Sequence, residues 1–421
     1  MKDTRMTSSF TLIQRLAVLA LGLFCVALPA APEKTRQLLT AGREPVRIVC
    51  IGDSITGVYY HSGGLRAYPE MLEIALHKAY PQAQVTVRNA GISGDTTKGA
   101  LARLDRDVIA HKPHLVTVMF GMNDLVGTPL AVFQKNLKEI VARCRAAGAE
   151  VVLCTQNSVV ETPTRPCSRL AEFTQAIRDM AKEESLGLAD CHSRFEEVRA
   201  KGEHEWSLLL SDTIHPNMDG HKLFASEIAK VISEKDIDLN DIGPPRPAMR
   251  HTVGLLKEGK PIKVLAMPPY DQLIGPALTR LFPDAQVAVT PWPTEGQSLV
   301  DIETYAKKVR SMSVDLVLIA VPPQATTPNP KEFASYYTWT MNWSLSFGVQ
   351  QWDVLVITPS VAKPDLADDE QQREALARRL MQGKDLHRIE RTKGDETPMP
   401  ELFATWITRQ MPPQPKQPLA R

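Results

Sequence analysis

The sequence predicts an α/β protein: a parallel sheet covered by helices on both faces, followed by a second, related α/β unit. Two observations favour this class. Short apolar runs rich in valine, isoleucine and leucine alternate with segments of helical periodicity, which is typical of parallel strands buried on both faces. The same alternation restarts after a proline-rich stretch past the middle of the chain. A chain of 421 residues also suits two or three domains of roughly 150 residues each.

The N-terminus is typical of an export signal. Lys2, Arg5 and Arg15 supply positive charge around an apolar stretch at 16–28, and small residues follow at 29–31. The apolar stretch is shorter than the roughly 20 residues that a membrane-spanning helix needs. We therefore expect a cleaved signal peptide over residues 1–31 and a periplasmic or secreted mature protein without stable membrane insertion. An uncleaved membrane anchor is the alternative.

The first α/β unit is expected over residues 40–237. Helical periods begin at Pro69 and near Leu101, and cover Leu130–Ala147 and Ser168–Glu184. Between them lie five strand-like runs, which predict a five-stranded parallel sheet. The predicted strands are Val46–Ile51, Gln84–Asn89, His114–Phe120, Glu150–Gln156 and the shorter Gly187–Cys191.

A linker is expected over residues 238–260, where three prolines fall close together, and a second unit over 261–410. The proline-rich tail at 411–421 is expected to be disordered. The second unit resembles the first: KLFASEIAK at 222–230 is matched by ELFATWITR at 401–409. We interpret this as a degenerate duplication, with an unrelated α/β domain as the alternative. Its predicted strands are Ile262–Met267, Gln286–Thr290, Asp315–Val321 and Asp353–Thr358.

Charge and cysteine content exclude several classes of function. Lysine and arginine number 49 against 48 aspartates and glutamates, so neither nucleic acid nor an anionic membrane is implied as a partner. Cys25 would leave with the signal, and the five remaining cysteines do not form a disulfide scaffold. Pairing of Cys167 with Cys191 stays open, as does the oligomeric state.

Polar motifs follow the predicted strands, where a parallel sheet places its ligands. Gly-Asp-Ser at 52–54 follows the first strand, and Gly52 permits a sharp turn there. RNAGISGDTT at 88–97 follows the second strand and FGMND at 120–124 the third, while DTIHPN at 212–217 precedes an amphipathic helix. Segments distant in the sequence can therefore meet at one site.

These residue types suit ester hydrolysis by a serine nucleophile. The Ser54 hydroxyl needs a base to take its proton, and His215 can do so near neutral pH. Asp212, three residues earlier, can orient the imidazole and stabilise its charged form. Negative charge on the carbonyl oxygen needs preset donors, for which the Ser54 and Gly94 N–H groups and the Asn123 amide are the natural set.

The four motifs together resemble the SGNH (GDSL-type) hydrolase family over roughly Val46–Val231. The resemblance implies a three-layer αβα sandwich of flavodoxin-like type. It also implies that Ser54, Asp212 and His215 form the catalytic triad, and that Ser54, Gly94 and Asn123 form the oxyanion hole.

Other residues near these motifs receive lesser roles. Tyr59 and His61 follow Ser54 closely and are candidates for substrate binding, although a surface position for His61 is the alternative. Asp53, Asp95 and Asp124 are expected to cap helices or brace loops. The sequence shows no metal-ligand cluster and no dinucleotide or Walker motif, so no cofactor or metal is expected.

The function predicted is that of an exported esterase acting on small acyl esters, with carbohydrate O-acetyl esters favoured as substrates. A lysophospholipase or thioesterase of the same family is the alternative. A glycan-binding module without catalysis is the alternative from another class. The second unit has MPPY at 267–270, PPQA at 322–325 and TPM at 397–399 where the first has its motifs, so we expect it to be non-catalytic.

Overall fold

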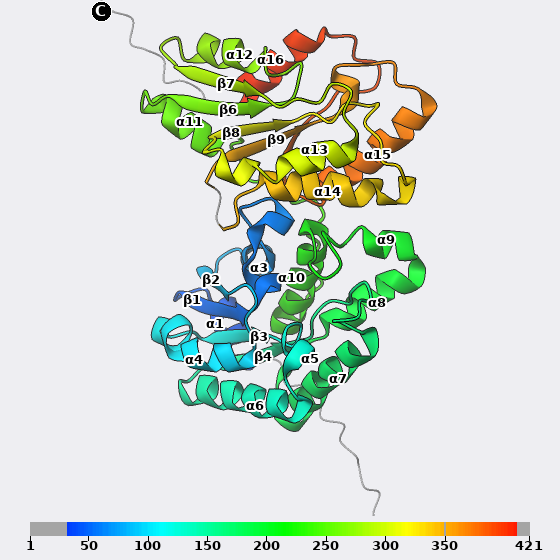
Figure 1. The fold of residues 1–421 in the computed structure, drawn as a ribbon. Helices are drawn as coiled ribbons and strands as arrows, with labels where there is room; N and C mark the ends of the chain where they lie inside the picture. The colour runs from blue at the N-terminus through cyan, green and yellow to red at the C-terminus, as the bar shows by residue number, and fades with distance from the viewer. Residues whose placement is uncertain (1–31, 349–350, 411–421) are drawn as a thin grey trace, which may run out of the picture.

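Two five-stranded parallel sheets form the framework of the chain, one in each half (Figure 1). The structure is a computed structural model that describes residues 32–348 and 351–410. The expected signal peptide at 1–31 and the expected tail at 411–421 lie outside the described residues. The α/β class predicted from the sequence is confirmed.

The sheet of the first half has the order β2-β1-β3-β4-β5, with every neighbouring pair parallel. All five predicted strands are present, because continuous apolar runs can be buried on both faces of such a sheet. They are β1 (Val46–Gly52), β2 (Val85–Gly91), β3 (Leu115–Met119), β4 (Glu150–Cys154) and β5 (Gly187–Ala189).

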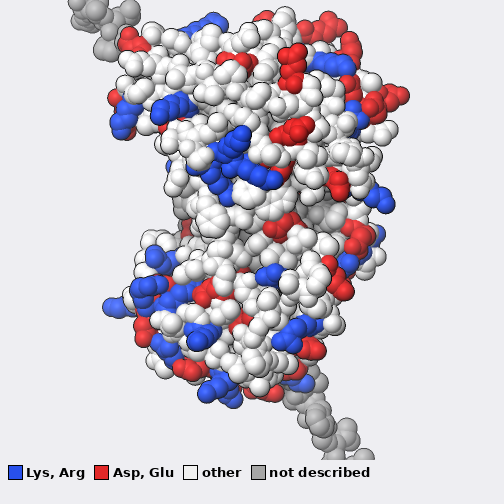
Figure 2. Space-filling model, in the orientation of Figure 1, with Lys and Arg blue, Asp and Glu red and all other residues white. Residues whose placement is uncertain are grey.

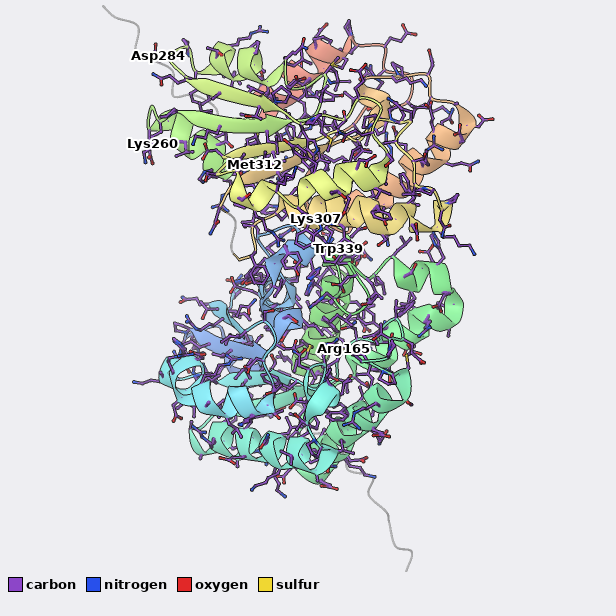
Figure 3. All side chains as sticks on the ribbon, viewed as in Figure 1. Arg165, Lys260, Asp284, Lys307, Met312 and Trp339 are labelled. Atoms are coloured by element: carbon purple, nitrogen blue, oxygen red, sulfur yellow. The ribbon has the colours of Figure 1, made fainter. Side chains whose placement is uncertain are left out.

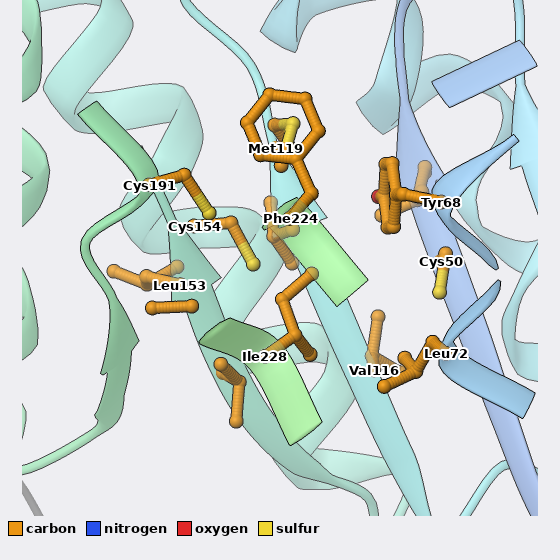
Figure 4. Packing of buried hydrophobic residues seen from close by; sticks show 14 of the residues in the cluster. Cys50, Tyr68, Leu72, Val116, Met119, Leu153, Cys154, Cys191, Phe224 and Ile228 are labelled. Atoms are coloured by element: carbon orange, nitrogen blue, oxygen red, sulfur yellow. The ribbon is translucent and has the colours of Figure 1, made fainter. Parts of the chain in front are cut away.

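Helices cover both faces of this sheet, which gives three layers (Figure 1). Figure 4 shows Phe224 and Ile228 of one helix lying among residues of the sheet, including Val116 and Leu153. On that face lie α1 (Glu33–Ala41), α3 (Tyr68–Ala79), α8 (Cys191–Lys201) and α10 (Met218–Ser233). On the other lie α4 (Thr97–Asp107), α6 (Leu130–Ala146) and α7 (Cys167–Glu183).

Helix α1 precedes the start expected for the first unit at residue 40. Its Thr35 donates from both the backbone nitrogen and Oγ1 to Glu150 at the start of β4, each over 2.7 Å. The helix is thereby tied to the sheet. The first unit thus includes a helix that carries no strong sequence motif.

The sheet of the second half has the order β10-β9-β8-β6-β7, which is the strand order of the first sheet. The shared order is what a duplicated unit would have, and duplication remains our interpretation. Strand β10 follows the four predicted strands and was not predicted. The five are β6 (Ile262–Ala266), β7 (Val287–Pro291), β8 (Leu316–Ile319), β9 (Asp353–Ile357) and β10 (His387–Ile389).

Helices also flank the second sheet on both sides (Figure 1). Helix α11 lies inside the stretch 238–260, which was expected to be a linker. The helix is part of the second half because Thr252, Val253 and Leu256 on one side of it are buried. On its side of the sheet lie α11 (Arg250–Lys257), α12 (Ile274–Leu281) and α16 (Met399–Gln410). Opposite are α13 (Leu299–Ala306), α14 (Phe333–Ser344) and α15 (Asp368–Gln382).

The two halves are joined by direct polar contacts. The Gly383 carbonyl accepts from the backbone nitrogen of Met218 over 2.7 Å, and Arg66 pairs with Asp385 over 2.7 Å. Trp339 of α14 lies where the halves meet (Figure 3). The second half therefore rests on the part of the first that leads into α10.

Surface charge and thiols agree with the composition. Both signs of charge are interspersed over the face seen in Figure 2. Cys167 and Cys191 are both free thiols, so the pairing left open by the sequence does not occur in this structure. Within the described ranges, no helix has the length and apolar character needed to span a bilayer.

Candidate active site

Ser54 lies at the carboxyl end of β1, at the start of the short helix α2 (Ser54–Gly57). The side chain of Asp53 caps this turn, because its Oδ1 accepts from the Ile55 nitrogen over 2.9 Å. A Cβ on Gly52 would lie 2.1 Å from Oγ1 of Thr56, so only glycine permits so close a turn. The serine is 8% exposed and sits at the edge where parallel strands gather their ligands.

The structure brings Ser54, His215 and Asp212 into one hydrogen-bonded chain. Oγ of Ser54 lies 2.9 Å from Nε2 of His215, and Nδ1 of His215 lies 2.8 Å from Oδ2 of Asp212. Because the carboxylate of Asp212 can only accept, Nδ1 of His215 carries the ring proton and donates it to Asp212. Nε2 of His215 therefore accepts from the Ser54 hydroxyl. This is the arrangement in which an imidazole serves as a general base.

A single loop holds both the aspartate and the histidine. Oδ1 of Asp212 accepts from the backbone nitrogens of Ile214, over 2.8 Å, and His215, over 2.7 Å. The Asn157 amide, after β4, donates to the Ile214 carbonyl over 2.9 Å. The carboxylate therefore uses one oxygen to shape the loop and the other to orient the ring, as the Asp-x-x-His spacing predicts.

The carboxylates beside Ser54 have opposite electrostatic environments. Burial opposes ionisation of Asp212, but the hydrogen bond and charge of His215 outweigh it and hold the pKa of Asp212 below its ordinary value. Burial raises the pKa of Asp53 to about 7, against the hydrogen bond from Ile55. Asp212 is thus the carboxylate that stays ionised to support an imidazolium.

Gly94 and Asn123 lie on the loops that follow β2 and β3. Gly94 has a φ of +75°, the left-handed conformation that favours glycine, and open space where a side chain would be. Nδ2 of Asn123 donates to the Asp95 carbonyl over 3.0 Å, which ties the two loops together. One of the two amide hydrogens of Asn123 is used in this bond.

Arg165, which no sequence motif singles out, fixes the orientation of Asn123. Its Nη2 donates to Oδ1 of Asn123 over 3.2 Å, and its Nε donates to the Met122 carbonyl over 3.3 Å. A guanidinium has only donors, so Oδ1 must face it and Nδ2 must face the Asp95 carbonyl. Figure 3 places Arg165 in the first half of the molecule, below the junction.

The two candidates that follow Ser54 differ in position. The Tyr59 hydroxyl donates to Glu70 of α3 over 2.9 Å. His61 is 1% exposed, which contradicts the surface alternative, and its ring stacks on that of His215 with centroids 4.1 Å apart and planes at 14°. His61 is therefore a neighbour of the imidazole that contacts Ser54.

Asp95 and Asp124 brace loops, as expected. Oδ2 of Asp95 accepts from Arg103 over 2.7 Å, and Oδ1 of Asp124 accepts from Oγ1 of Thr97 over 2.6 Å. The first bond ties the loop after β2 to α4, and the second ties the start of α4 to the segment after β3. They hold in place the segments that carry Gly94 and Asn123.

Among the residues that the structure describes, one group of metal-ligand type is present, whereas the sequence predicts none. Ligand atoms of His61, Asp212 and His215 all lie within 4.8 Å of one another. The two imidazole planes are stacked, however, so their in-plane lone pairs run side by side and do not converge on one point about 2.0–2.1 Å from each nitrogen. We assign Asp212 and His215 to the hydrogen-bonded chain of Ser54, and His61 is the ring that stacks on His215.

Two residues of the second half also reach this site, and no sequence motif indicates them. Lys384 and Asn342 both contact Oγ of Ser211, the residue before Asp212. Their approach depends on how the two halves dock, which local sequence patterns do not report.

Comparison with known proteins places the first half among esterases. Residues 50–223 match the model of the GDSL-like lipase/acylhydrolase family. The chain is 28% identical to an acetylxylan esterase of Geobacillus stearothermophilus over 44% of this chain and 93% of that protein. It is 32% identical to thioesterase 1/protease 1/lysophospholipase L1 of Escherichia coli (strain K12), over 44% of this chain and 81% of that protein.

The crystal structure of Axe2, an acetylxylan esterase from Geobacillus stearothermophilus, matches 46% of this chain and 97% of its own, with a TM-score of 0.40 and 24% sequence identity.

Proposed function

Because the chain belongs to the GDSL-like lipase/acylhydrolase family and is a serine ester hydrolase, we propose that it cleaves small acyl esters through an acyl-enzyme on Ser54. The observation that carries this proposal is the unbroken chain from Ser54 through His215 to Asp212, with contacts of 2.9 and 2.8 Å. This series of hydrogen bonds accounts for deprotonation of the nucleophile and for stabilisation of the resulting imidazolium.

The reaction proceeds in two steps. Nε2 of His215 takes the hydroxyl proton while Oγ of Ser54 bonds to the carbonyl carbon, and the imidazolium then donates that proton to the departing alcohol. In the second step His215 takes a proton from a water molecule as that water attacks the acyl carbon. The imidazolium then returns the proton to Oγ of Ser54 as the bond to the acyl group breaks and the acid leaves. Asp212 stays ionised throughout, in keeping with its lowered pKa.

The negative charge on the carbonyl oxygen is met by donors from three loops. We assign this role to the backbone N–H groups of Ser54 and Gly94 and to the amide of Asn123. Asn123 suits it because Arg165 and Asp95 fix its orientation before a substrate arrives. Donors held in place in this way are worth about 2.7–4 kcal/mol each in the transition state.

Labelling with a fluorophosphonate tests the nucleophile. The full-length protein should take up one probe per chain, and Ser54→Ala should take up none. Ser168→Ala, which alters an exposed serine of the same half, is the matched control and should label as the wild type does. Labelling of Ser54→Ala at the wild-type rate would show that another residue is the nucleophile.

Among substrates we favour carbohydrate O-acetyl esters. Support comes from the acetylxylan esterase relative, which matches across nearly its whole length. The alternative is a lysophospholipid or thioester, favoured by the ISGDT motif at 92–96 and by the thioesterase/lysophospholipase relative. Initial rates on acetylated xylan, lysophosphatidylcholine and an acyl thioester, measured with Ser54→Ala as the blank, separate the two.

We further propose that the protein is exported and that its second half is non-catalytic. The basic and apolar pattern of residues 1–31 supports export. In the second half, β6 is followed by MPPY at 267–270, which has no serine, and β8 by PPQA at 322–325, where Gln324 stands in place of the asparagine. Esterase turnover that persists in full-length Ser54→Ala would reveal a second active site and contradict this assignment.

A further inference from the structure

A buried polar cluster lies where the second half meets the loop that carries Asp212 and His215. Lys384, between α15 and β10, is 1% exposed. Its Nζ donates to the His61 carbonyl over 2.7 Å and to Oγ of Ser211 over 2.6 Å. A buried amine is costly unless hydrogen bonds satisfy it, so these contacts fix where the side chain sits.

Contacts made by both chain neighbours of Lys384 hold its segment in place. The Gly383 carbonyl accepts from the Met218 nitrogen over 2.7 Å, and Asp385 pairs with Arg66 over 2.7 Å. A Cβ on Gly383 would lie 2.4 Å from Nδ2 of Asn217, so the approach leaves room only for glycine. Lys384 is thus inserted between two anchored neighbours.

The directions of the hydrogen bonds follow from the donors present. Oγ of Ser211 accepts from Lys384, and Nδ2 of Asn342 lies 3.2 Å away as a second donor. The hydroxyl proton of Ser211 has two acceptors in reach, Oδ1 of Asn342 at 3.3 Å and Nδ1 of His61 at 2.9 Å, and we assign it to the nearer one, Nδ1 of His61. When Nδ1 accepts, a neutral imidazole carries its proton on Nε2.

His61 is neutral and faces Asp212. Burial, and after it the neighbouring His215, hold the pKa of His61 well below its ordinary value, so the ring carries one proton. Its Nε2 is buried without a hydrogen-bond partner within the described part of the chain and lies 3.6 Å from Oδ2 of Asp212. That distance is too long for a hydrogen bond, so the N–H group of His61 lies beside the oxygen that orients His215 without bonding to it.

We infer that Lys384 is a positioning residue for the triad. Its hydrogen bond to Ser211 orients the Ser211 hydroxyl toward Nδ1 of His61, and the His61 proton therefore resides on Nε2, 3.6 Å from Asp212. The His61 ring, stacked at 4.1 Å, in turn supports the imidazole of His215. The inference rests on the triad role proposed above for Ser54, His215 and Asp212. It makes the second half part of the catalytic apparatus although it supplies no reacting group.

The test compares full-length variants on 4-nitrophenyl acetate. Lys384→Met keeps the length of the side chain and removes the donor, and we expect kcat to fall about tenfold with KM within about twofold. Ser211→Ala should give a similar fall. Because both act on one path, the double variant should lose no more than the more affected single variant.

Controls separate positioning from folding. Lys363→Met alters an exposed lysine of the second half that pairs with Glu370, and it should keep the wild-type kcat. Melting curves are recorded for every variant, since a purely structural role would lower stability without the selective loss of kcat. If Lys384→Met fails to fold, Ser211→Ala alone decides the matter through its kcat and KM.

The outcomes distinguish this inference from the proposed function. If the wild type takes up no fluorophosphonate at Ser54, the proposed function fails, whatever Lys384 does. If the wild type is labelled and active but folded Lys384→Met or Ser211→Ala keeps kcat within twofold, the positioning role is overturned. Losses that multiply in the double variant would likewise overturn the shared path.

Discussion

Lys384 shows how one residue can link ionisation to stability. Burial lowers its pKa from the ordinary 10.5 to about 7, against the opposing charge of Asp212. The folded state therefore binds this proton less tightly than the unfolded chain does. Above pH 10.5 both states are neutral, whereas between about 7 and 10.5 the unfolded chain alone is protonated.

This difference predicts that the free energy of unfolding gains a rising contribution with pH across that window. The slope from one such group is at most ~1.4 kcal/mol per pH unit. Melting temperatures of wild type and Lys384→Met, measured side by side from pH 7 to 9.5, isolate the contribution, because other groups titrate equally in both proteins. We expect the melting temperature of the wild type to rise relative to that of Lys384→Met as the pH increases. A difference that stays constant would contradict the lowered pKa.

At the scale of elements, the site is assembled from loops at the carboxyl ends of four strands. Ser54 follows β1, Gly94 follows β2, Asn123 follows β3, and Asn157 after β4 holds the loop of His215. Hydrogen bonds from neighbouring loops hold these loops in place, as those of Asn157 and Arg165 do. A residue outside the motifs can therefore affect the orientation of the site residues.

Arg165 provides a test at this scale. Arg165→Met removes the donor that orients the Asn123 amide, which we propose as an oxyanion donor, so kcat should fall by roughly tenfold or more while KM changes little. Steady-state kinetics on 4-nitrophenyl acetate measure the effect. Arg106→Met, an exposed arginine paired with Asp107, is the matched control and should leave kcat unchanged. An unaltered kcat in Arg165→Met would mean that Asn123 needs no external orientation.

Much of the fold could be predicted from the sequence because parallel strands are continuous apolar runs. Leu115–Met119 is buried at every position and stands out for that reason. Strand β10 (His387–Ile389) does not, because it is an edge strand of three residues with a single buried side chain. The sequence does not predict helix α11, because the three prolines before it are typical of a linker.

The site divides in the same way. Ser54 and His215 lie in motifs whose local spacing carries information about their geometry. Lys384 lies 323 residues from His61, in a segment without any motif, and its burial arises only from docking of the halves. Local patterns predict groups within a loop, whereas contacts between distant units need coordinates.

At the scale of the whole molecule, the halves are held together by a buried ion pair. Arg66 of the first half binds both oxygens of Asp385, whose side chain is 2% exposed. Burial raises the pKa of Asp385 to about 6, and Arg66 opposes that rise. The pair is therefore far more sensitive to loss of one partner than to loss of both.

Arg66→Met should lower the free energy of unfolding by about 3–5 kcal/mol, because it leaves the Asp385 carboxylate buried and unpaired. Arg66→Met combined with Asp385→Leu should recover much of that loss. Differential scanning calorimetry at pH 7.5 measures both. Equal melting temperatures for wild type and Arg66→Met would show that the pair contributes nothing to the junction.

The reach of Lys384 across the junction has a consequence for how such an enzyme could be switched off. A ligand that binds between the halves would break the hydrogen bond from Lys384 to Ser211. The Ser211 hydroxyl would then no longer be held toward Nδ1 of His61. If the proposed role of Lys384 holds, such a ligand would slow turnover without contacting Ser54. The seam between the halves is thus a place for inhibitors that leave the nucleophile untouched.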